Sequence, residues 1–117
     1  MGRVIGFELN SQEPEVTASF YERMFGWKVG KAKWDYRAVT TGSGNSTGID
    51  GGIAKGPAEF PNGIRLQIEV ESIDQTIGQA VKHGAAIVRD RMEFDGFYLA
   101  YLEDPTGLGI GLIENKK

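Results

Sequence analysis

The chain has 117 residues, of which 40% are apolar and 25% charged, and its formal net charge is −3. This length suits a single domain, and so small a charge without a basic stripe argues against a nucleic-acid partner. Because there is no cysteine, disulfides, thiolate nucleophiles and sulfur-ligated metals are excluded. No apolar run reaches the roughly 20 residues of a membrane span, and no charged-then-apolar leader precedes the first strand pattern. We therefore expect a cytoplasmic protein without a membrane partner.

The first half of the chain predicts a strand, a helix and three further strands. Apolar and polar residues alternate over residues 3–9, as in a half-buried strand. A helix follows to about Phe25, with Ser11 as N-cap, Pro14 in the first turn and Gly26 at its end. Its apolar residues at helical spacing are Val16, Phe20 and Met24, with Tyr21 as a further candidate, and Phe20 and Phe25 are expected to be core residues. Short strands are expected near residues 27–31, 35–41 and 48–55.

The second half repeats this order. A strand over residues 64–71 has apolar side chains on one face and Arg65, Gln67 and Glu69 on the other. Ser72 caps a helix that ends at Gly84, and its inward residues are expected to be Ile73, Ile77 and Val81. Strands near residues 86–94, 97–103 and 108–114 complete the half.

An internal repeat relates the two halves. Thr47–Ile53 and Thr106–Leu112 read as copies about 59 residues apart, and Phe7–Ser11 echoes Ile68–Ser72 at nearly the same period. Neither half is large enough to bury its own core, so the two should pack together and enclose a shared cavity. The sequence thus predicts an α+β fold of two βαβββ modules in one domain spanning residues 1–117. The parts are module one (1–55), a Pro- and Gly-rich hinge (56–63) and module two (64–117).

Two motifs give this arrangement a family resemblance. Ser19–Trp27 (SFYERMFGW) and Tyr101–Gly107 (YLEDPTG), together with Gly51–Ile53, resemble elements of the vicinal oxygen chelate superfamily. This superfamily is also called the glyoxalase/bleomycin-resistance/dioxygenase fold. The resemblance covers nearly the whole chain and implies a curled, eight-stranded mixed sheet around a ligand cavity. It does not imply one activity, because the superfamily includes isomerases, dioxygenases, thiol transferases and drug-binding proteins.

The resemblance also implies where a metal would bind, and those positions do not carry ligand-type side chains. Metal-dependent members take ligands from the first and last strands of each module. The corresponding positions here are Gly6 (or Val4), Arg65 or Gln67, Gly52 and Gly111. Of these, only Gln67 has a side chain that can ligate a divalent cation, and it is a weak ligand. We therefore expect no metal and no other cofactor, with the glycines lining the cavity either as open volume or as points of tight backbone curvature.

Two carboxylates are the candidates for catalysis. Glu8 and Glu69 are assigned equivalent places in the two halves, on the inferred cavity side, where they could hold a hard cation or act as general base. They could equally be ordinary solvent-facing residues, with Glu69 paired to Arg65. His83, the only histidine, lies at a helix end, where the helix dipole favours a cation, so a structural role is expected for it.

Aromatic and polar residues near the strands predict a small-molecule site. The expected ligand-binding residues are Trp34, Tyr36, Arg65, Gln67 and Tyr98. By resemblance to the bleomycin-resistance branch, the chain is interpreted as a metal-independent binding protein for an unknown small organic molecule, and as a homodimer. The alternative is a glyoxalase-like lyase, an isomerase or a dioxygenase that uses an atypical metal site or a carboxylate base.

Overall fold

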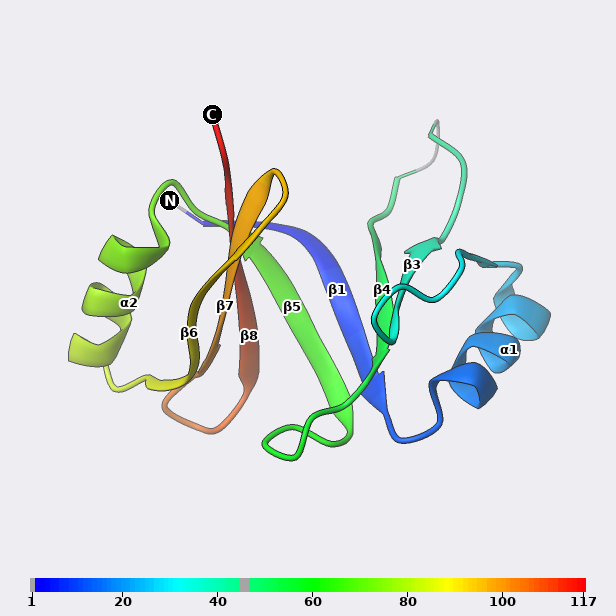
Figure 1. The fold of residues 1–117 in the computed structure, drawn as a ribbon, viewed down its shortest axis with the longest axis horizontal. Coiled ribbons are helices and arrows are strands. Elements are labelled where there is room, and N and C mark those ends of the chain that lie inside the picture. Colours follow the sequence, from blue (N-terminus) through cyan, green and yellow to red (C-terminus); the bar gives the residue numbers. More distant parts are fainter. Residues whose placement is uncertain (1, 45–46) are drawn as a thin grey trace. The chain divides into compact units, whose positions relative to one another are not determined.

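A computed structural model describes residues 2–44 and 47–117, with the element order of two βαβββ repeats. The chain divides into two compact units, which we call the N-terminal module (Gly6–Ile64) and the C-terminal module (Met1–Ile5 with Arg65–Lys117). The described residues form eight strands and two helices, so the predicted α+β class and the strand–helix order are confirmed (Figure 1). No helix among the described residues is both long and apolar enough to cross a membrane.

The N-terminal module is a four-stranded mixed sheet with one helix. Its strands are β1 (Arg3–Ser11), which belongs to this module from Gly6 onward, β2 (Lys28–Val29), β3 (Tyr36–Thr40) and β4 (Asp50–Lys55). Within this module β1 runs parallel to β4, while β3 is antiparallel to both β4 and β2. The core combines the buried residues Leu9, Ala18, Val39 and Ile53 with the partly buried Phe7, Tyr21, Trp27 and Val29.

Helix α1 (Pro14–Phe25) covers one face of this sheet. Pro14 fits the first turn because its missing N–H is not needed there, and Gly26 ends the helix with a left-handed φ of 71°. The prediction of Ser11 as N-cap was wrong: Glu13 occupies that position without a side-chain cap, and the Ser11 hydroxyl lies 2.7 Å from that of Thr17. The helix is tied to the sheet by an ion pair between Glu15 and the buried guanidinium of Arg37 on β3.

The predicted core face of α1 was also wrong. Pro14 and Ala18 are the residues that α1 buries, and Tyr21 packs against the core. The residues with large exposed apolar side chains are Val16, Phe20, Met24 and Phe25. The i, i+4 spacing identified a stripe correctly, but this stripe is on the outside of the helix.

The C-terminal module repeats the architecture. Its strands β5 (Gly63–Glu69), β6 (Ala86–Phe94), β7 (Phe97–Glu103) and β8 (Gly109–Asn115) are arranged in the order β5-β8-β7-β6, with β5 and β8 parallel. Helix α2 (Ile73–Lys82) packs on β6, β7 and β8. The buried core residues are Ile73, Ala100, Leu102 and Leu112, with Ile77 and Ala80 of α2 packed against them.

Most of the sequence interpretation of α2 is confirmed. The Ser72 hydroxyl accepts a hydrogen bond from the backbone N–H of Gln75 at 3.2 Å, as expected of an N-cap. Ile73 is fully buried and Ile77 packs on the core, whereas Val81, predicted to face inward, is 47% exposed.

A tight turn precedes β8. The Asp104 carboxylate accepts hydrogen bonds from the Thr106 hydroxyl at 2.7 Å and from the backbone N–H groups of Thr106 and Leu108 at 2.8 and 3.0 Å. The bond from the Thr106 hydroxyl, followed by those from the backbone, lowers the pKa of Asp104 below its usual range. This turn occupies the Asp-Pro-x-Gly motif of the sequence analysis.

The segment predicted as a hinge is held to the N-terminal module. The Gln12 side-chain amide donates to the carbonyl oxygens of Gly56 at 3.0 Å and Pro61 at 2.8 Å. The backbone N–H of Gly56 donates to Ser11 at 3.1 Å, and that of Phe60 donates to Pro57 at 3.0 Å. These bonds close residues 56–61 into a compact loop.

Candidate functional site

The helix-free face of the N-terminal sheet carries the first group of predicted site residues. Phe7 and Leu9 of β1 pack into the core on the α1 side, so Gly6, Glu8 and Asn10 point to the opposite face. Glu8 pairs in register with Gly52 of β4. The parallel pairing of β1 with β4 therefore places the carboxylate of Glu8 beside a residue without a side chain.

Tyr36 covers this glycine. Its ring and hydroxyl occupy the space that a Cβ atom on Gly52 would need. Gly52 is therefore a point of close approach for an aromatic ring, and the volume left by its missing side chain is filled by Tyr36. The phenol lies over the strand position next to Glu8, so three of the predicted site residues, Glu8, Tyr36 and Gly52, are brought together.

Glu8 is unusual because a carboxylate is held out of solvent. Glu8 and Asn10 are each only 4% exposed, and the Asn10 amide donates to Glu8 Oε2 at 2.9 Å. Burial of a charged group costs free energy unless hydrogen bonds compensate it. Polar side chains kept in this state are frequent at functional sites, where they are held ready for a ligand or a reaction.

The C-terminal sheet carries a second polar group on its helix-free face. Ile68 of β5 and Val70, just after the strand, pack on the core, so Arg65, Gln67 and Glu69 point away from α2. The Arg65 guanidinium lies 3.7 Å from the centroid of the Tyr101 ring, and Arg65 is 3% exposed. Stacking on a ring fixes the plane of a guanidinium, whose in-plane N–H donors suit carboxylate or carbonyl oxygens.

Gln67 and Glu69 have separate surroundings on that face. Gln67 pairs with Gly111 of β8, and the Tyr101 ring and the Gln67 side chain lie 3.5 and 3.8 Å from the position of a Cβ on Gly111. The Asn115 amide donates a hydrogen bond to the Glu69 carboxylate. Arg65, Gln67 and Gly111 therefore gather around Tyr101, and Glu69 pairs with Asn115.

Strand register corrects one predicted equivalence. Glu8 lies beside Gly52 in the N-terminal module, and Gln67 lies beside Gly111 in the C-terminal module. Since Gly52 and Gly111 are the matched glycines of the repeat, the counterpart of Glu8 is Gln67, not Glu69. The period of about 59 residues already contained this answer, whereas the Phe7–Ser11 echo was out of register by two residues.

Two predicted ligand-binding residues lie elsewhere. Tyr98 points to the α2 side of its sheet, packs against the core, and has Arg91 and Lys116 at 4.7 and 5.1 Å from its ring. Trp34 lies in the turn before β3 and is 86% exposed. Neither belongs to the groups around Glu8 or Arg65.

The positions at which metal-dependent relatives bind a cation do not fit one here. The family resemblance assigns these positions to Gly6 (or Val4), Arg65 or Gln67, Gly52 and Gly111, and of these only Gln67 has a side chain that can ligate a cation. Strand register places Glu8 beside Gly52 and Gln67 beside Gly111. Within residues 2–44 and 47–117, no group of three or more His, Cys, Asp and Glu residues could hold a metal ion.

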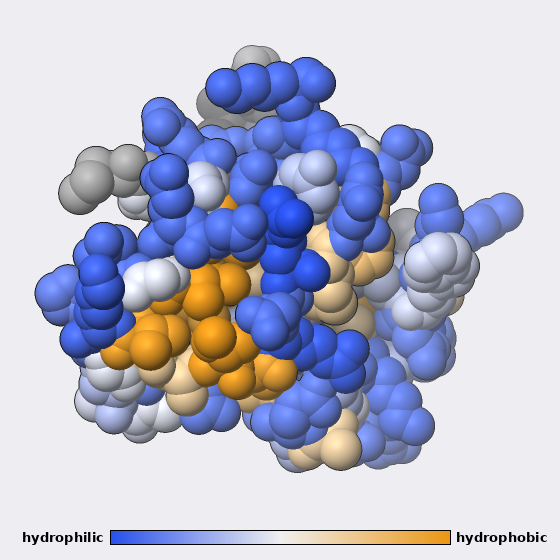
Figure 2. Space-filling view, turned by 60° about the vertical axis from the view of Figure 1, so that its left-hand side comes forward, coloured by the Kyte–Doolittle hydropathy of each residue, from blue (hydrophilic) through white to orange (hydrophobic). Residues whose placement is uncertain are grey.

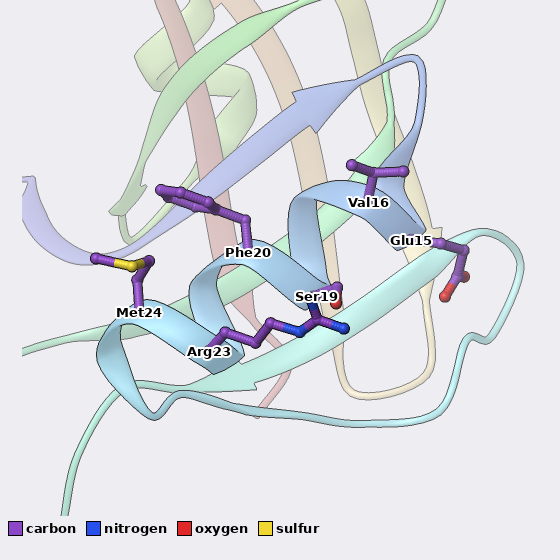
Figure 3. Close-up of a pocket in the computed structure, with 6 residues that line it drawn as sticks. All are labelled: Glu15, Val16, Ser19, Phe20, Arg23 and Met24. Atoms are coloured by element: carbon purple, nitrogen blue, oxygen red, sulfur yellow. The ribbon is translucent and has the colours of Figure 1, made fainter.

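Two apolar grooves lie outside these faces. One, of about 460 Å³, runs along the outer side of α1 (Figure 3). The other, of about 480 Å³, lies in the C-terminal module between α2 and the sheet, with Ile68, Val70, Ile110 and Leu112 among its lining residues. Figure 2, turned to bring the side that carries α2 forward, shows apolar side chains gathered in a patch bordered by hydrophilic ones.

Asn10 and Tyr101 are the site residues that the sequence interpretation missed. Asn10 stands two positions after Glu8, and strand alternation alone would have placed both on one face. Strand alternation places Tyr98 and Tyr101 on opposite faces of the sheet. Which of the two lies on the same face as Arg65 depends on which face α2 covers. The face that a helix covers depends on tertiary packing, so the alternation of polar and apolar residues along one strand did not predict it.

Comparisons with known proteins agree with this architecture. A family model for the glyoxalase-like domain matches residues 6–113. The chain resembles the structure of an NAD-dependent benzaldehyde dehydrogenase from Legionella pneumophila, at a TM-score of 0.67 and 16% identity. The similarity covers 95% of this chain and 98% of that one. It resembles a glyoxalase/bleomycin resistance protein/dioxygenase superfamily member from Vibrio splendidus at a TM-score of 0.65 and 16% identity, covering 99% of this chain and 100% of that one.

A third similar structure is a variant of Streptomyces coelicolor methylmalonyl-CoA epimerase in complex with 2-nitronate-propionyl-CoA. Its TM-score is 0.65 at 12% identity, with 97% of this chain and 94% of that one covered. At such identities these structures share the fold alone. The chain matches no curated protein sequence. The family match over residues 6–113 shows that the chain belongs to the glyoxalase-like domain family, within the vicinal oxygen chelate superfamily.

Proposed function

We propose that this protein binds a small organic molecule and that the Glu8 carboxylate, on the helix-free face of the N-terminal module, is its main polar anchor. The observation that carries the proposal is the burial of Glu8 and Asn10, 4% exposed each, beside the Tyr36 ring and Gly52. Ligand sites typically combine apolar or aromatic walls with a few oriented polar groups. The ligand expected here is an aromatic or apolar molecule with a hydroxyl or amine that donates to Glu8.

Arg65 is the candidate polar anchor of a separate site, within the C-terminal module. Stacking on Tyr101 fixes the plane of its guanidinium, which favours a carboxylate or carbonyl oxygen as partner. We propose that binding needs no metal, because the family resemblance gives Gly6 or Val4, Arg65 or Gln67, Gly52 and Gly111 as the metal positions. Of these, only Gln67 has a side chain that can ligate a cation, and it is a weak ligand. Metal-independent binding is thus supported by the shortage of ligating side chains at these positions.

A thermal-shift screen followed by titration calorimetry tests the proposal. The panel consists of small aromatic alcohols, amines and acids. For a compound that raises the melting temperature, Glu8→Gln should weaken binding at least tenfold, because a charge-assisted hydrogen bond is worth roughly 1.5–3 kcal/mol. Glu69→Gln is the matched control and should change Kd less than threefold, because Glu69 pairs with Asn115. Equal effects of both variants would refute Glu8 as the anchor.

A second candidate function, supported by the same carboxylate, is proton abstraction. Glu8 is held by Asn10 and shielded from solvent, which suits a general base near a substrate carbonyl or enol in an isomerase or lyase. In that case Glu8→Gln would abolish turnover of a bound compound while leaving its Kd within about threefold, since an amide of the same shape still fills the site. Measuring both Kd and turnover for Glu8→Gln therefore distinguishes ligand binding from catalysis.

A further inference from the structure

Helix α1 carries a row of apolar side chains on its exposed surface. Val16, Phe20 and Met24 follow each other at i, i+4 spacing and are 62%, 52% and 60% exposed. A second row, Glu15, Ser19 and Arg23, runs beside it, and the two rows line one groove (Figure 3). Contiguous apolar surface of this kind, bordered by polar groups, is typical of a contact surface.

The two rows are complementary to themselves. Each is centred near Ser19 and Phe20, with Val16 and Glu15 one turn before the centre and Met24 and Arg23 one turn after it. Around a two-fold axis at this centre, antiparallel helices bring Val16 of one copy against Met24 of the other. The same operation brings Glu15 of each copy against Arg23 of the other, once toward each end of the contact. An isologous interface requires this kind of self-complementary patch.

We propose that α1 packs antiparallel against α1 of a second copy of this chain, around a two-fold axis near Ser19 and Phe20. Rows at i, i+4 spacing are the ridges that interlock in the commonest class of helix packing. Ser19 is the smallest residue of the groove and leaves room for the Phe20 ring of the second copy. Phe20 is held by edge-on contacts with Tyr21 and Phe25, at centroid distances of 5.2 and 6.4 Å.

The charges favour a second copy over other occupants. The groove has an anionic end at Glu15 and a cationic end at Arg23, which an antiparallel copy matches with opposite signs. A strongly acidic or strongly basic peptide would meet repulsion at one end. Glu15 already pairs with Arg37, and a carboxylate has acceptor positions for both guanidinium groups.

Sedimentation velocity over a concentration series tests this interface. The wild type should sediment at twice the 12.8 kDa chain mass, and Phe20→Glu and Arg23→Glu should each weaken association at least tenfold. Arg23→Glu places carboxylates opposite each other and leaves the core unchanged, so it serves if Phe20→Glu fails to fold. Leu108→Glu is the matched control, because Leu108 is also a large exposed apolar residue, at 67% against 52% for Phe20, and lies in a turn of the other module. A monomeric wild type, or dimers unaffected by both α1 variants, would overturn the proposal.

A single-thiol experiment locates the contact directly. Because the chain has no cysteine, Ser19→Cys introduces one thiol near the proposed axis, and a short bismaleimide should link two copies rapidly. Lys31→Cys, an exposed position outside α1, should link only at the rate of random collision. Equal rates would contradict the interface. So would a monomeric protein that binds the apolar dye ANS in a Phe20-dependent way, since that would assign the groove to a small ligand.

Discussion

Glycines at matched positions of the two modules have different surroundings, and this difference gives a prediction at the scale of single residues. A Cβ on Gly52 would collide with the far end of the Tyr36 ring, whereas a Cβ on Gly111 would meet its neighbours at 3.4–3.8 Å, which is ordinary contact. A Cβ on Gly51 would collide with the Phe7 carbonyl oxygen, which belongs to the backbone and cannot swing aside.

The three alanine variants should therefore rank in stability. Urea unfolding should show Gly111→Ala within about 0.5 kcal/mol of wild type and Gly52→Ala destabilised by about 1–2 kcal/mol, with Gly51→Ala worse than both, because overpacking typically costs 1–3 kcal/mol or more. Adding Tyr36→Ala to Gly52→Ala should recover most of that loss, as expected when two residues compete for one space. A Gly52→Ala effect independent of Tyr36 would show that the ring does not occupy this space.

At the scale of elements, the turn before β3 combines backbone strain with an exposed aromatic ring. Lys33 and Tyr36 exchange two backbone hydrogen bonds of 2.8 and 3.0 Å around Trp34 and Asp35. Both central residues have positive φ, 56° and 62°, as in the type I′ turns that favour Asn and Gly. Arg37 donates to the Asp35 carbonyl at 3.1 Å and helps to hold this conformation.

Replacing the two turn residues by Asn-Gly should stabilise the protein. Trp34→Asn combined with Asp35→Gly should raise the free energy of unfolding by about 1–2 kcal/mol, since the left-handed conformation costs a bulky residue such as Trp34 roughly that much, while Asp tolerates it better. Trp34→Ala is the control, because it removes the ring and keeps the left-handed position occupied by a residue that disfavours it. A destabilised double variant in urea unfolding would mean that Trp34 makes contacts that outweigh its strain.

The same pair of variants separates stability from binding. If Trp34 contributes to ligand affinity, as the sequence interpretation predicts, both the double variant and Trp34→Ala should bind a panel ligand more weakly. In that case the strain in this turn would be retained for function, as strained backbone often is. Unchanged affinity in both variants would remove Trp34 from the predicted site.

At the scale of the whole molecule, much of the fold could be predicted from the sequence. Alternation along the strands, Ser72 at a helix N-cap and Gly26 at a helix end are local signals, and the repeat revealed the second module from the first. The outer face of α1 was misassigned because an i, i+4 apolar row is the same pattern whether it faces a sheet or a second molecule. Only packing shows that Ala18 and Tyr21, not Phe20, meet the core.

The candidate site was predicted less completely, for a related reason. Glu8, Arg65 and Gln67 were identified from strand alternation, yet the pairing of Glu8 with Gly52 depends on register between distant strands. Tyr98 lies on the face of the sheet that α2 covers and Tyr101 on the opposite face, and the sequence does not show which face the helix covers. The turn at Trp34 carries no Gly or Asn, so its left-handed conformation left no mark in the sequence.

Binding without a metal is the central claim, and calorimetry after chelation tests it most directly. The protein is dialysed against EDTA and then titrated with the panel compound that gives the largest thermal shift. Anchoring by Glu8 predicts the same Kd and stoichiometry before and after chelation, with a Kd at least tenfold weaker in Glu8→Gln. Binding that disappears with EDTA and returns on adding a divalent cation would contradict the account.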